Sequence, residues 1–189
     1  MPSRGAQRRR AVGISVGRGA QARTAGSRGA RVRLAELLRG RNLAQVRASL
    51  DAEGHAPLPA LFSAARCGQL LRDPEPWFEL TRLVKDECQP LACDEAPDEG
   101  HALVLVALLC DAHAFSGGEI VMTEQRPRMQ SRPMVSPLQR GDAVLIAAGA
   151  RQVQGSRGAY RAIVRYGVAR VREGCRQGLH AVFAADPHF

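Results

Sequence analysis

The stretch from Phe115 to Ile146 constrains the fold most, because glycine-containing turns introduce two expected strands within it. The Gly117-Gly118 pair precedes a strand expected over residues 119–123, and a Pro-x-x-x-Gly-Asp turn at 137–142 precedes one over 143–147. Glycine allows a positive φ angle and a close approach of the backbone. The stretch therefore predicts short strands joined by tight turns.

The loop between these two strands is rich in arginine, at Arg126, Arg128 and Arg132. In a jelly roll such a loop would lie at the mouth of the barrel. Two interpretations stay open: the arginines contact an acidic or phosphate-bearing substrate, or they form an ordinary solvated loop.

Other segments extend the strand pattern through the C-terminal half. Residues 102–110 form a continuous apolar run, which is typical of a strand covered on both faces. Strands with outward-facing charges are expected over 160–166 and 168–172, and a last one over 179–184. Six or so short strands behind a helical flank predict a mainly β domain with N-terminal helices (α+β), in the form of an antiparallel sandwich or jelly roll.

The N-terminal part of the globular chain, residues 34–88, is predicted to be a helical support for this β domain, which spans 89–189. Apolar residues recur at helical spacing over 34–50, and Ser63 is in position to cap a following helix. Residues 54–59 favour a turn and a short extended piece, and the segment from Trp77 to Cys88 favours one more short helix.

The positive charge is concentrated in residues 1–33, which hold nine arginines and no acidic residue. The whole chain has 27 basic and 18 acidic residues, so residues 34–189 carry no net charge. The first 33 residues contain almost no large apolar side chains, which predicts a disordered tail. Two interpretations stay open: an arm that binds polyanions such as nucleic acid, or an unstructured extension without a function.

Composition also limits the classes of protein to consider. The five cysteines include no Cys-x-x-Cys pair, so reduced thiols are expected rather than a zinc site or a disulfide framework. The longest apolar run, 102–110, is too short to span a bilayer, and no signal or transit peptide is recognisable. A soluble, cytoplasmic protein without a membrane partner is expected.

Three motifs together resemble a known family. They are FSGGE at 115–119, PLxxGDAVLI at 137–146 and GVxRVRxGxR at 167–176. This set is similar to the C-terminal half of the 2-oxoglutarate- and Fe(II)-dependent oxygenases of the prolyl 4-hydroxylase-like group, over residues 90–184. The resemblance implies a double-stranded β-helix (jelly roll). Family members carry a longer segment before these motifs, so an incomplete barrel with an uncovered face, prone to self-association, is expected.

The resemblance also implies an iron ion held by a His-x-Asp pair and a distal histidine, with 2-oxoglutarate bound to an arginine or lysine. Three protein ligands on one face of Fe(II) leave positions open for the cosubstrate and O2, and a guanidinium suits a carboxylate. The His-x-Asp pair falls at Ala92-Cys93-Asp94, the distal histidine at Tyr166 and the cosubstrate arginine at Arg176. The resemblance thus implies Asp94 as a metal ligand and Arg176 as the cosubstrate ligand, while both histidine positions are replaced.

Four other side chains are candidates for replacing the missing imidazoles: His101, His113, His180 and Cys93. Each is also compatible with an ordinary surface or packing role. Two hypotheses follow. The chain is an Fe(II)- and 2-oxoglutarate-dependent dioxygenase that hydroxylates C–H bonds weakly or not at all, or it is a non-catalytic binding module that retains the oxygenase fold. The sequence does not indicate the substrate.

Overall fold

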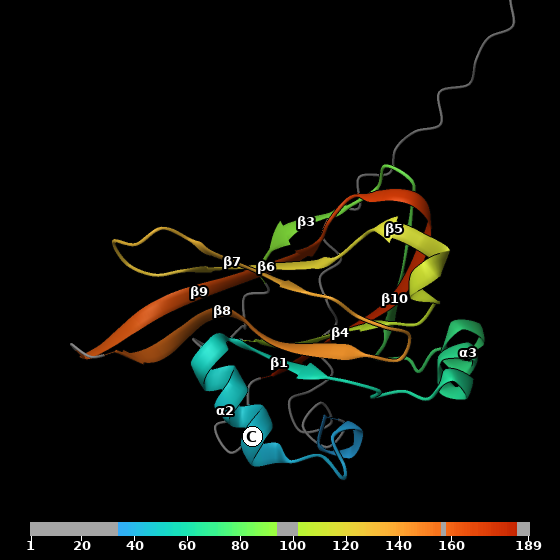
Figure 1. The fold of residues 1–189 in the computed structure, drawn as a ribbon. Coiled ribbons are helices and arrows are strands. Elements are labelled where there is room, and N and C mark those ends of the chain that lie inside the picture. Colours follow the sequence, from blue (N-terminus) through green and yellow to red (C-terminus); the bar gives the residue numbers. More distant parts are fainter. Residues whose placement is uncertain (1–33, 94–101, 156–157, 185–189) are drawn as a thin grey trace, which may run out of the picture.

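The computed structural model describes residues 34–93, 102–155 and 158–184, and shows two layers of antiparallel strands with helices packed outside one of them (Figure 1). The tail of residues 1–33 lies outside the described residues. The elements in chain order are α2 (Leu43–Glu53), β1 (His55–Leu58), α3 (Ala64–Arg72), β2 (Glu79–Val84), β3 (Gln89–Ala92), β4 (Ala102–Leu108), η1 (Ala112–Ala114), β5 (Phe115–Gly117), β6 (Ile120–Gln125), β7 (Arg132–Ser136), β8 (Ala143–Gly155), β9 (Gly158–Val168) and β10 (Val171–Ala184).

The strands form one continuous, bent sheet that is folded into two layers. One layer has the order β1-β8-β4-β10-β2 and the other has the order β3-β9-β6-β7. Strand β8 passes from one layer to the other, because its first half pairs with β4 and its second half with β9. The change of partner begins at Gly149, whose φ of 90° is readily adopted only by glycine.

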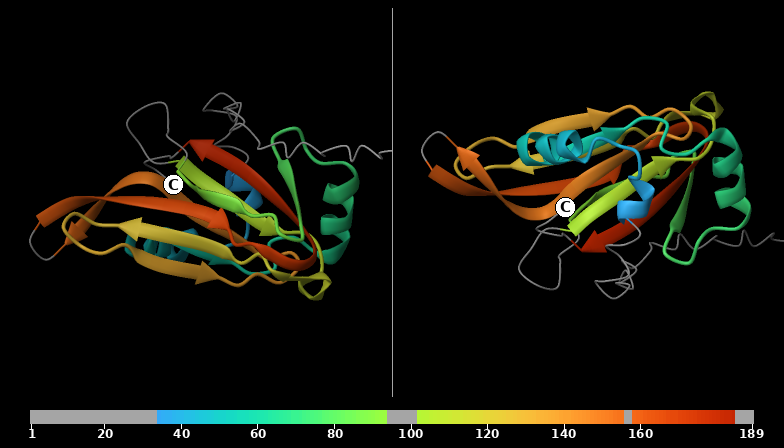
Figure 2. Two further views of the ribbon diagram at one scale, coloured as in Figure 1. Left: turned by 90° about the horizontal axis from the view of Figure 1, so that it is seen from above. Right: turned by 90° about the horizontal axis from the view of Figure 1, so that it is seen from below.

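Buried apolar side chains fill both the space between the layers and the space under the helices. Strand β4 contributes to both, since Val104 and Val106 belong to the cluster between the layers whereas Leu103 and Leu105 belong to the cluster on the helix side. All seven residues of β4 are buried, which confirms the prediction of a strand covered on both faces. In the view from below in Figure 2, α2 lies across the strands and α3 lies at one end of them.

The expected fold class is confirmed: the described chain is mainly antiparallel β with few helices. Ser63 caps α3, since its side chain accepts a hydrogen bond from the backbone N–H of Arg66, as predicted. The extended piece expected over 54–59 is also present as β1. Among the described residues, no helix combines the length and the apolar character needed to cross a membrane.

Two expectations about individual elements are wrong. The short helix expected between Trp77 and Cys88 is instead strand β2, because residues 79–84 pair with β10 and this pairing outweighs the weak local helical preference. The separate strands expected over 168–172 and 179–184 are one strand, β10, which changes partners from β5 to β4 and β2 along its length. Strands β1 and β2, from the predicted helical support, share a layer with β4 and β8.

Candidate functional site

Arg176 lies on β10 with its side chain directed between the two layers. Alternation along β10 puts Leu179, Ala181 and Phe183 on the helix side, so Arg176 has the opposite orientation, toward the barrel interior. The residue is 1% exposed. Its Nε donates a hydrogen bond of 3.0 Å to the carbonyl of Gly118, and its buried Nη1 has no hydrogen-bond partner among the described residues.

The surroundings of Arg176 are unfavourable for an isolated charge. Burial lowers the pKa of Arg176, and the nearby Cys110 has a smaller, opposite effect. No ion pair to Arg176 is found in the described part of the chain. A buried donor without a partner costs free energy, and a bound anion would satisfy it. Arg176 is therefore suited to hold a carboxylate.

A cavity of about 160 Å³ borders Arg176. Its lining combines apolar residues with Ser116 and Ser136, and Glu119 also lines it. The remaining lining residues are Leu108, Ala112, Phe115, Gly117, Gly118, Ile120, Pro137 and Leu138. The two motifs that dominate the sequence, FSGGE and the Pro-x-x-x-Gly-Asp turn, thus contribute to the wall of this cavity.

Glycines allow the guanidinium to fit in this position. A Cβ atom on Gly178 would lie 2.6 Å from Nη1 of Arg176, and one on Gly118 would lie 3.0 Å from its Cδ. Gly117 and Gly118 have φ angles of 76° and 68°, so the positive φ and the close approach expected of this pair are confirmed. The role of Gly178 was missed by the sequence analysis, although its spacing of two from Arg176 on an expected strand was a signal.

The two positions that the resemblance assigns to histidines lie side by side. Strand β3 pairs with β9, and Ala92 is directly opposite Tyr166, so both side chains project from the same face. Tyr166 is 4% exposed and belongs to the cluster between the layers, whereas Ala92 is exposed. Asp94, the expected metal ligand, lies outside the described residues. The structure therefore brings Ala92 and Tyr166 together and does not describe the third position.

An imidazole does lie next to Tyr166, and it comes from β10. The phenolic oxygen of Tyr166 is 2.7 Å from Nε2 of His180, and the two rings are stacked with their centroids 5.9 Å apart. On its other side, Nδ1 of His180 is 3.8 Å from the Glu79 carboxylate of β2. Of the four candidate substitutes, His113 is exposed on η1, Cys93 is half-buried, and His101 lies outside the described residues.

The described residues do not fit the ligand set of two histidines and one carboxylate. Within the described ranges, no group of three His, Cys, Asp or Glu side chains is placed to hold a metal ion. A methyl group and a phenol occupy the two positions at which the resemblance implies imidazoles. Arg176 and its cavity suit a carboxylate, whereas Ala92 and Tyr166 offer no imidazole to an iron ion.

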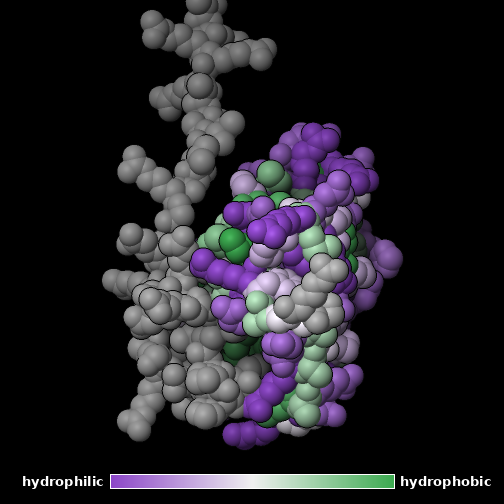
Figure 3. Space-filling model, turned by 90° about the vertical axis from the view of Figure 1, so that its left-hand side faces the viewer, coloured by the Kyte–Doolittle hydropathy of each residue, from purple (hydrophilic) through white to green (hydrophobic). Residues whose placement is uncertain are grey.

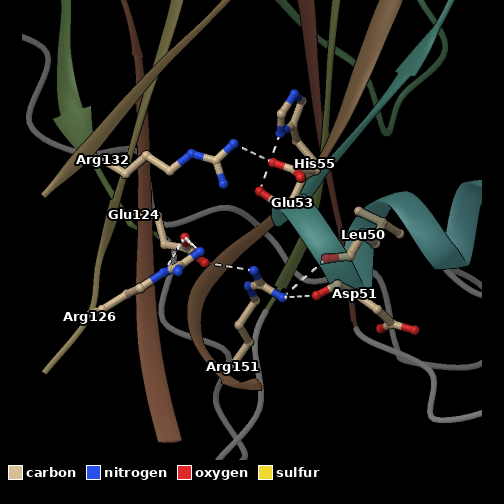
Figure 4. A network of polar contacts seen from close by, with 8 residues as sticks. All are labelled: Leu50, Asp51, Glu53, His55, Glu124, Arg126, Arg132 and Arg151. Carbon is tan, nitrogen blue, oxygen red and sulfur yellow. Dashed lines mark hydrogen bonds and ion pairs between the residues drawn. The ribbon is translucent and has the colours of Figure 1, made fainter. Parts of the chain in front are cut away.

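A second polar cluster connects α2 to the barrel (Figure 4). Glu124 of β6 is fully buried, with one carboxylate oxygen 2.7 Å from Arg151 and the other 2.7 Å from Arg126. Arg151 also donates to the carbonyl groups of Leu50 and Asp51 near the C-terminus of α2. Glu124 raises the pKa of Arg126 through this hydrogen bond. No motif in the sequence indicated this cluster.

The cluster changes the interpretation of the arginine-rich loop. Arg126 is paired with Glu124, and Arg132 is paired with Glu53 of α2. Arg128 lies in the turn between β6 and β7, is exposed and has a φ of 59°. Two of the three arginines therefore make structural ion pairs, and Arg128 remains available to a ligand.

Comparisons with known proteins agree with this fold. Residues 69–186 match the family model described as an oxygenase catalysing oxidative methylation of damaged DNA. The architecture is that of the double-stranded β-helix proteins. The chain belongs to the oxygenase family that this model describes, and its sequence motifs resemble those of the 2-oxoglutarate- and Fe(II)-dependent oxygenases. Fe(II) and 2-oxoglutarate are the cofactors that the sequence resemblance implies.

Solved structures and curated relatives give the extent of the similarity. A Pseudomonas putida prolyl-4-hydroxylase is 12% identical, with a TM-score of 0.51 over 76% of this chain and 95% of that one. A 2OG-Fe(II) oxygenase family oxidoreductase from Burkholderia pseudomallei is 21% identical, with a TM-score of 0.39 over 56% of this chain and 40% of that one. Uncharacterized proteins from two strains of Mycobacterium tuberculosis are 36% identical over 69 residues, which is 36% of this chain and 30% of each relative.

Proposed function

We propose that this protein binds 2-oxoglutarate through Arg176 and that its C–H hydroxylation activity is weak or absent. The observation that carries the proposal is the buried guanidinium of Arg176, which borders a cavity of about 160 Å³ and has an unpartnered Nη1 among the described residues. Arg176 occupies the position of the cosubstrate arginine in the family motif. Ser116 and Ser136 would add hydroxyl donors in the same cavity.

A carboxylate is expected to bind beside the Arg176 guanidinium more favourably than water alone. A guanidinium binds a carboxylate through charge-assisted hydrogen bonds, which are about twice as strong as neutral ones. Inside a low-dielectric cavity the attraction is larger than at the surface. The apolar walls formed by Leu108, Ile120 and Leu138 suit the methylene groups of a short oxo acid.

Weak or absent hydroxylation is proposed because the metal ligands differ from those of the family. Even groups that only orient a metal ligand typically contribute about 10–100-fold to metal affinity or activity. The replacement of two imidazoles by Ala92 and Tyr166 is expected to cost more, and Asp94 alone would hold Fe(II) weakly. The chain would then retain cosubstrate binding as its main property.

The test is a calorimetric titration with 2-oxoglutarate in the presence of a chelator. The wild-type protein is expected to bind, and Arg176→Met is expected to weaken binding by more than about tenfold because the charge-assisted bonds are lost. Arg170→Met is the matched control, since Arg170 is an exposed arginine six residues earlier whose side chain is 68% accessible. Equal binding by wild type and Arg176→Met would refute the assignment of Arg176.

A second titration tests the hydroxylation part of the proposal. Fe(II) is added anaerobically with 2-oxoglutarate, and the weak visible charge-transfer band of chelated iron is recorded, followed by succinate measurement after admission of O2. The proposal expects neither signal at stoichiometric iron. A stoichiometric band with succinate formation would show an active oxygenase.

An active oxygenase acting on nucleic acid is the second candidate, favoured by the family description and by one surface. The end of the molecule formed by the β6–β7 and β8–β9 hairpins is largely hydrophilic (Figure 3), and it carries the exposed Arg128 and Arg161.

Fluorescence anisotropy with a labelled DNA oligonucleotide separates two sources of binding. Loss of binding on removal of residues 1–33 would assign it to the tail, whereas retained binding that weakens in Arg128→Ala would assign it to this end.

A further inference from the structure

We propose that the cavity beside Arg176 takes short monocarboxylic acids with an apolar chain in preference to dicarboxylic acids. This inference rests on the proposed function, carboxylate binding at Arg176, and it names the class of ligand that the cavity selects. The physical reason is that the cavity combines one positively charged residue with a largely apolar lining.

The charged residues around the cavity match a single carboxylate. Among the described residues that line it, Arg176 alone is basic and Glu119 alone is acidic. The guanidinium of Arg176 makes no ion pair within the described ranges, and its buried Nη1 has no hydrogen-bond partner there. A first carboxylate therefore gains a cation, whereas a second carboxylate in the same cavity is opposed by the negative charge of Glu119.

The cation for a second carboxylate is the one that the sequence resemblance assigns to iron. In that arrangement one end of 2-oxoglutarate meets the arginine and the other end binds the metal. Here Ala92 and Tyr166 stand at the two histidine positions, and no three His, Cys, Asp or Glu side chains of the described chain are placed to hold a metal ion. The second carboxylate of a dicarboxylic acid would lose hydration without gaining a partner, which is unfavourable.

The rest of the lining suits an alkyl chain. Leu108 and Ile120 are each 1% exposed, and Phe115 and Leu138 are half-buried around the same cavity. Removal of methylene and methyl groups from water against such residues is favourable. The cavity volume of about 160 Å³ is below the roughly 300–1,000 Å³ of pockets for drug-sized ligands, so an acid of a few carbon atoms is the fitting size.

The experiment is a calorimetric titration of the full chain, with a chelator present, using 2-oxopentanoate and 2-oxoglutarate. The two acids differ only at the end of the chain remote from the oxo group, which is a methyl group in the first and a carboxylate in the second. The wild-type protein is expected to bind 2-oxopentanoate at least about threefold more tightly, because no second charge has to be desolvated.

Leu138→Lys tests the explanation by charge. Position 138 lines the cavity and is half-buried, and the stem of a lysine can keep the apolar contact while its ammonium group supplies a second cation. This variant is expected to bind 2-oxoglutarate at least as tightly as 2-oxopentanoate. Leu43→Lys is the matched control, since Leu43 is 39% exposed on α2 and is not part of the cavity lining, so the wild-type preference should be kept.

Two results would overturn the inference and leave the proposed function intact. One is binding of 2-oxoglutarate by the wild type as tightly as 2-oxopentanoate, or more tightly. The other is an unchanged preference in a Leu138→Lys variant whose circular dichroism shows a retained fold; should this variant not fold, the wild-type comparison decides. Binding of neither acid, or equal affinities in wild type and Arg176→Met, would instead remove the carboxylate site and with it both proposals.

Discussion

At the scale of single residues, Gly178 decides whether Arg176 can occupy its buried position. The guanidinium lies against the backbone of β10 where any Cβ atom would be 2.6 Å from Nη1 and 2.9 Å from the carbonyl of Ala107. Motif matching finds Arg176 but not the glycine that makes room for it. The requirement becomes visible only when the direction of the arginine side chain is known.

Gly178→Ala is therefore expected to displace Arg176. Overpacking of a buried site typically costs about 1–3 kcal/mol, and 2-oxoglutarate affinity should fall with it. Urea unfolding and calorimetry measure the two effects. Gly68→Ala is the matched control, because this glycine lies within α3 with no neighbour closer than 3.5 Å, and alanine there should stabilise by about 0.5–1 kcal/mol. Unchanged affinity in Gly178→Ala would contradict the proposed fit.

Cys67 gives a prediction about pH. Burial raises the pKa of the Cys67 thiol, with the Arg140 guanidinium acting in the opposite direction. The raised pKa means that the native state keeps the proton at a pH where the unfolded chain releases it, so this group's contribution to stability decreases as pH rises above the usual thiol pKa.

Alkylation by iodoacetamide at about pH 9 should accordingly be much slower at Cys67 than at the exposed Cys88, since the thiolate is the reactive form. Mass spectrometry of tryptic peptides over time measures both rates. Equal rates in the native protein, with the same reagent and pH, would contradict the buried placement of Cys67.

At the scale of elements, the Glu124 cluster connects α2 to strands β6 and β8. Arg151 neutralises Glu124 and also binds carbonyl groups at the C-terminus of α2, where the helix dipole favours a positive charge. The partners are 27 and about 100 positions apart in the chain. No local pattern could indicate that they meet.

Removal of one member of this buried pair is expected to be strongly destabilising. Arg151→Met leaves the Glu124 carboxylate with a single arginine partner, and loss of one partner of a buried ion pair costs about 3–5 kcal/mol. Urea denaturation measures the loss of unfolding free energy in Arg151→Met, in Glu124→Gln and in the double variant. The loss in the double variant should be smaller than the sum of the two single losses.

Arg132→Met is the control for this cluster, because the Arg132–Glu53 pair is nearly half exposed on both sides. Exposed pairs contribute about 0–1 kcal/mol. If Arg132→Met lost as much unfolding free energy as Arg151→Met, burial would not explain the difference expected between the two ion pairs.

At the scale of the whole molecule, the net charge is divided unevenly between the tail and the folded part. All of the net charge of +9 comes from residues 1–33, and the family match begins at residue 69. We expect the fold to be independent of the tail, because residues 1–33 contain almost no large apolar side chains that could join a core.

Removal of residues 1–33 should leave the thermal unfolding temperature unchanged and should lower solubility near neutral pH, because a chain without net charge associates more readily. Differential scanning calorimetry and a precipitation assay at increasing protein concentration test the two parts. A large fall in the unfolding temperature would refute the prediction of an independent tail.

The sequence by itself determined the fold class, which follows from local signals: alternation of apolar residues and glycine turns. The assignment of Arg176 to the cosubstrate position, and of Ala92 and Tyr166 to the two histidine positions, is what the resemblance to the oxygenases implies. The same signals failed at β2, where pairing with β10 outweighed the local helical preference. The strands predicted in place of β8 and β10 were also too short, because a strand that changes pairing partners along its length has no local marker in the sequence.

The tertiary structure alone decided which groups surround these positions. It placed His180 against Tyr166, Gly178 under Arg176, and Arg151 between Glu124 and α2. Each contact joins side chains through the register and curvature of strands, and hydrogen bonds across strands depend on that register rather than on distance along the chain. The chemistry of the site is therefore set by pairing that the sequence pattern does not encode locally.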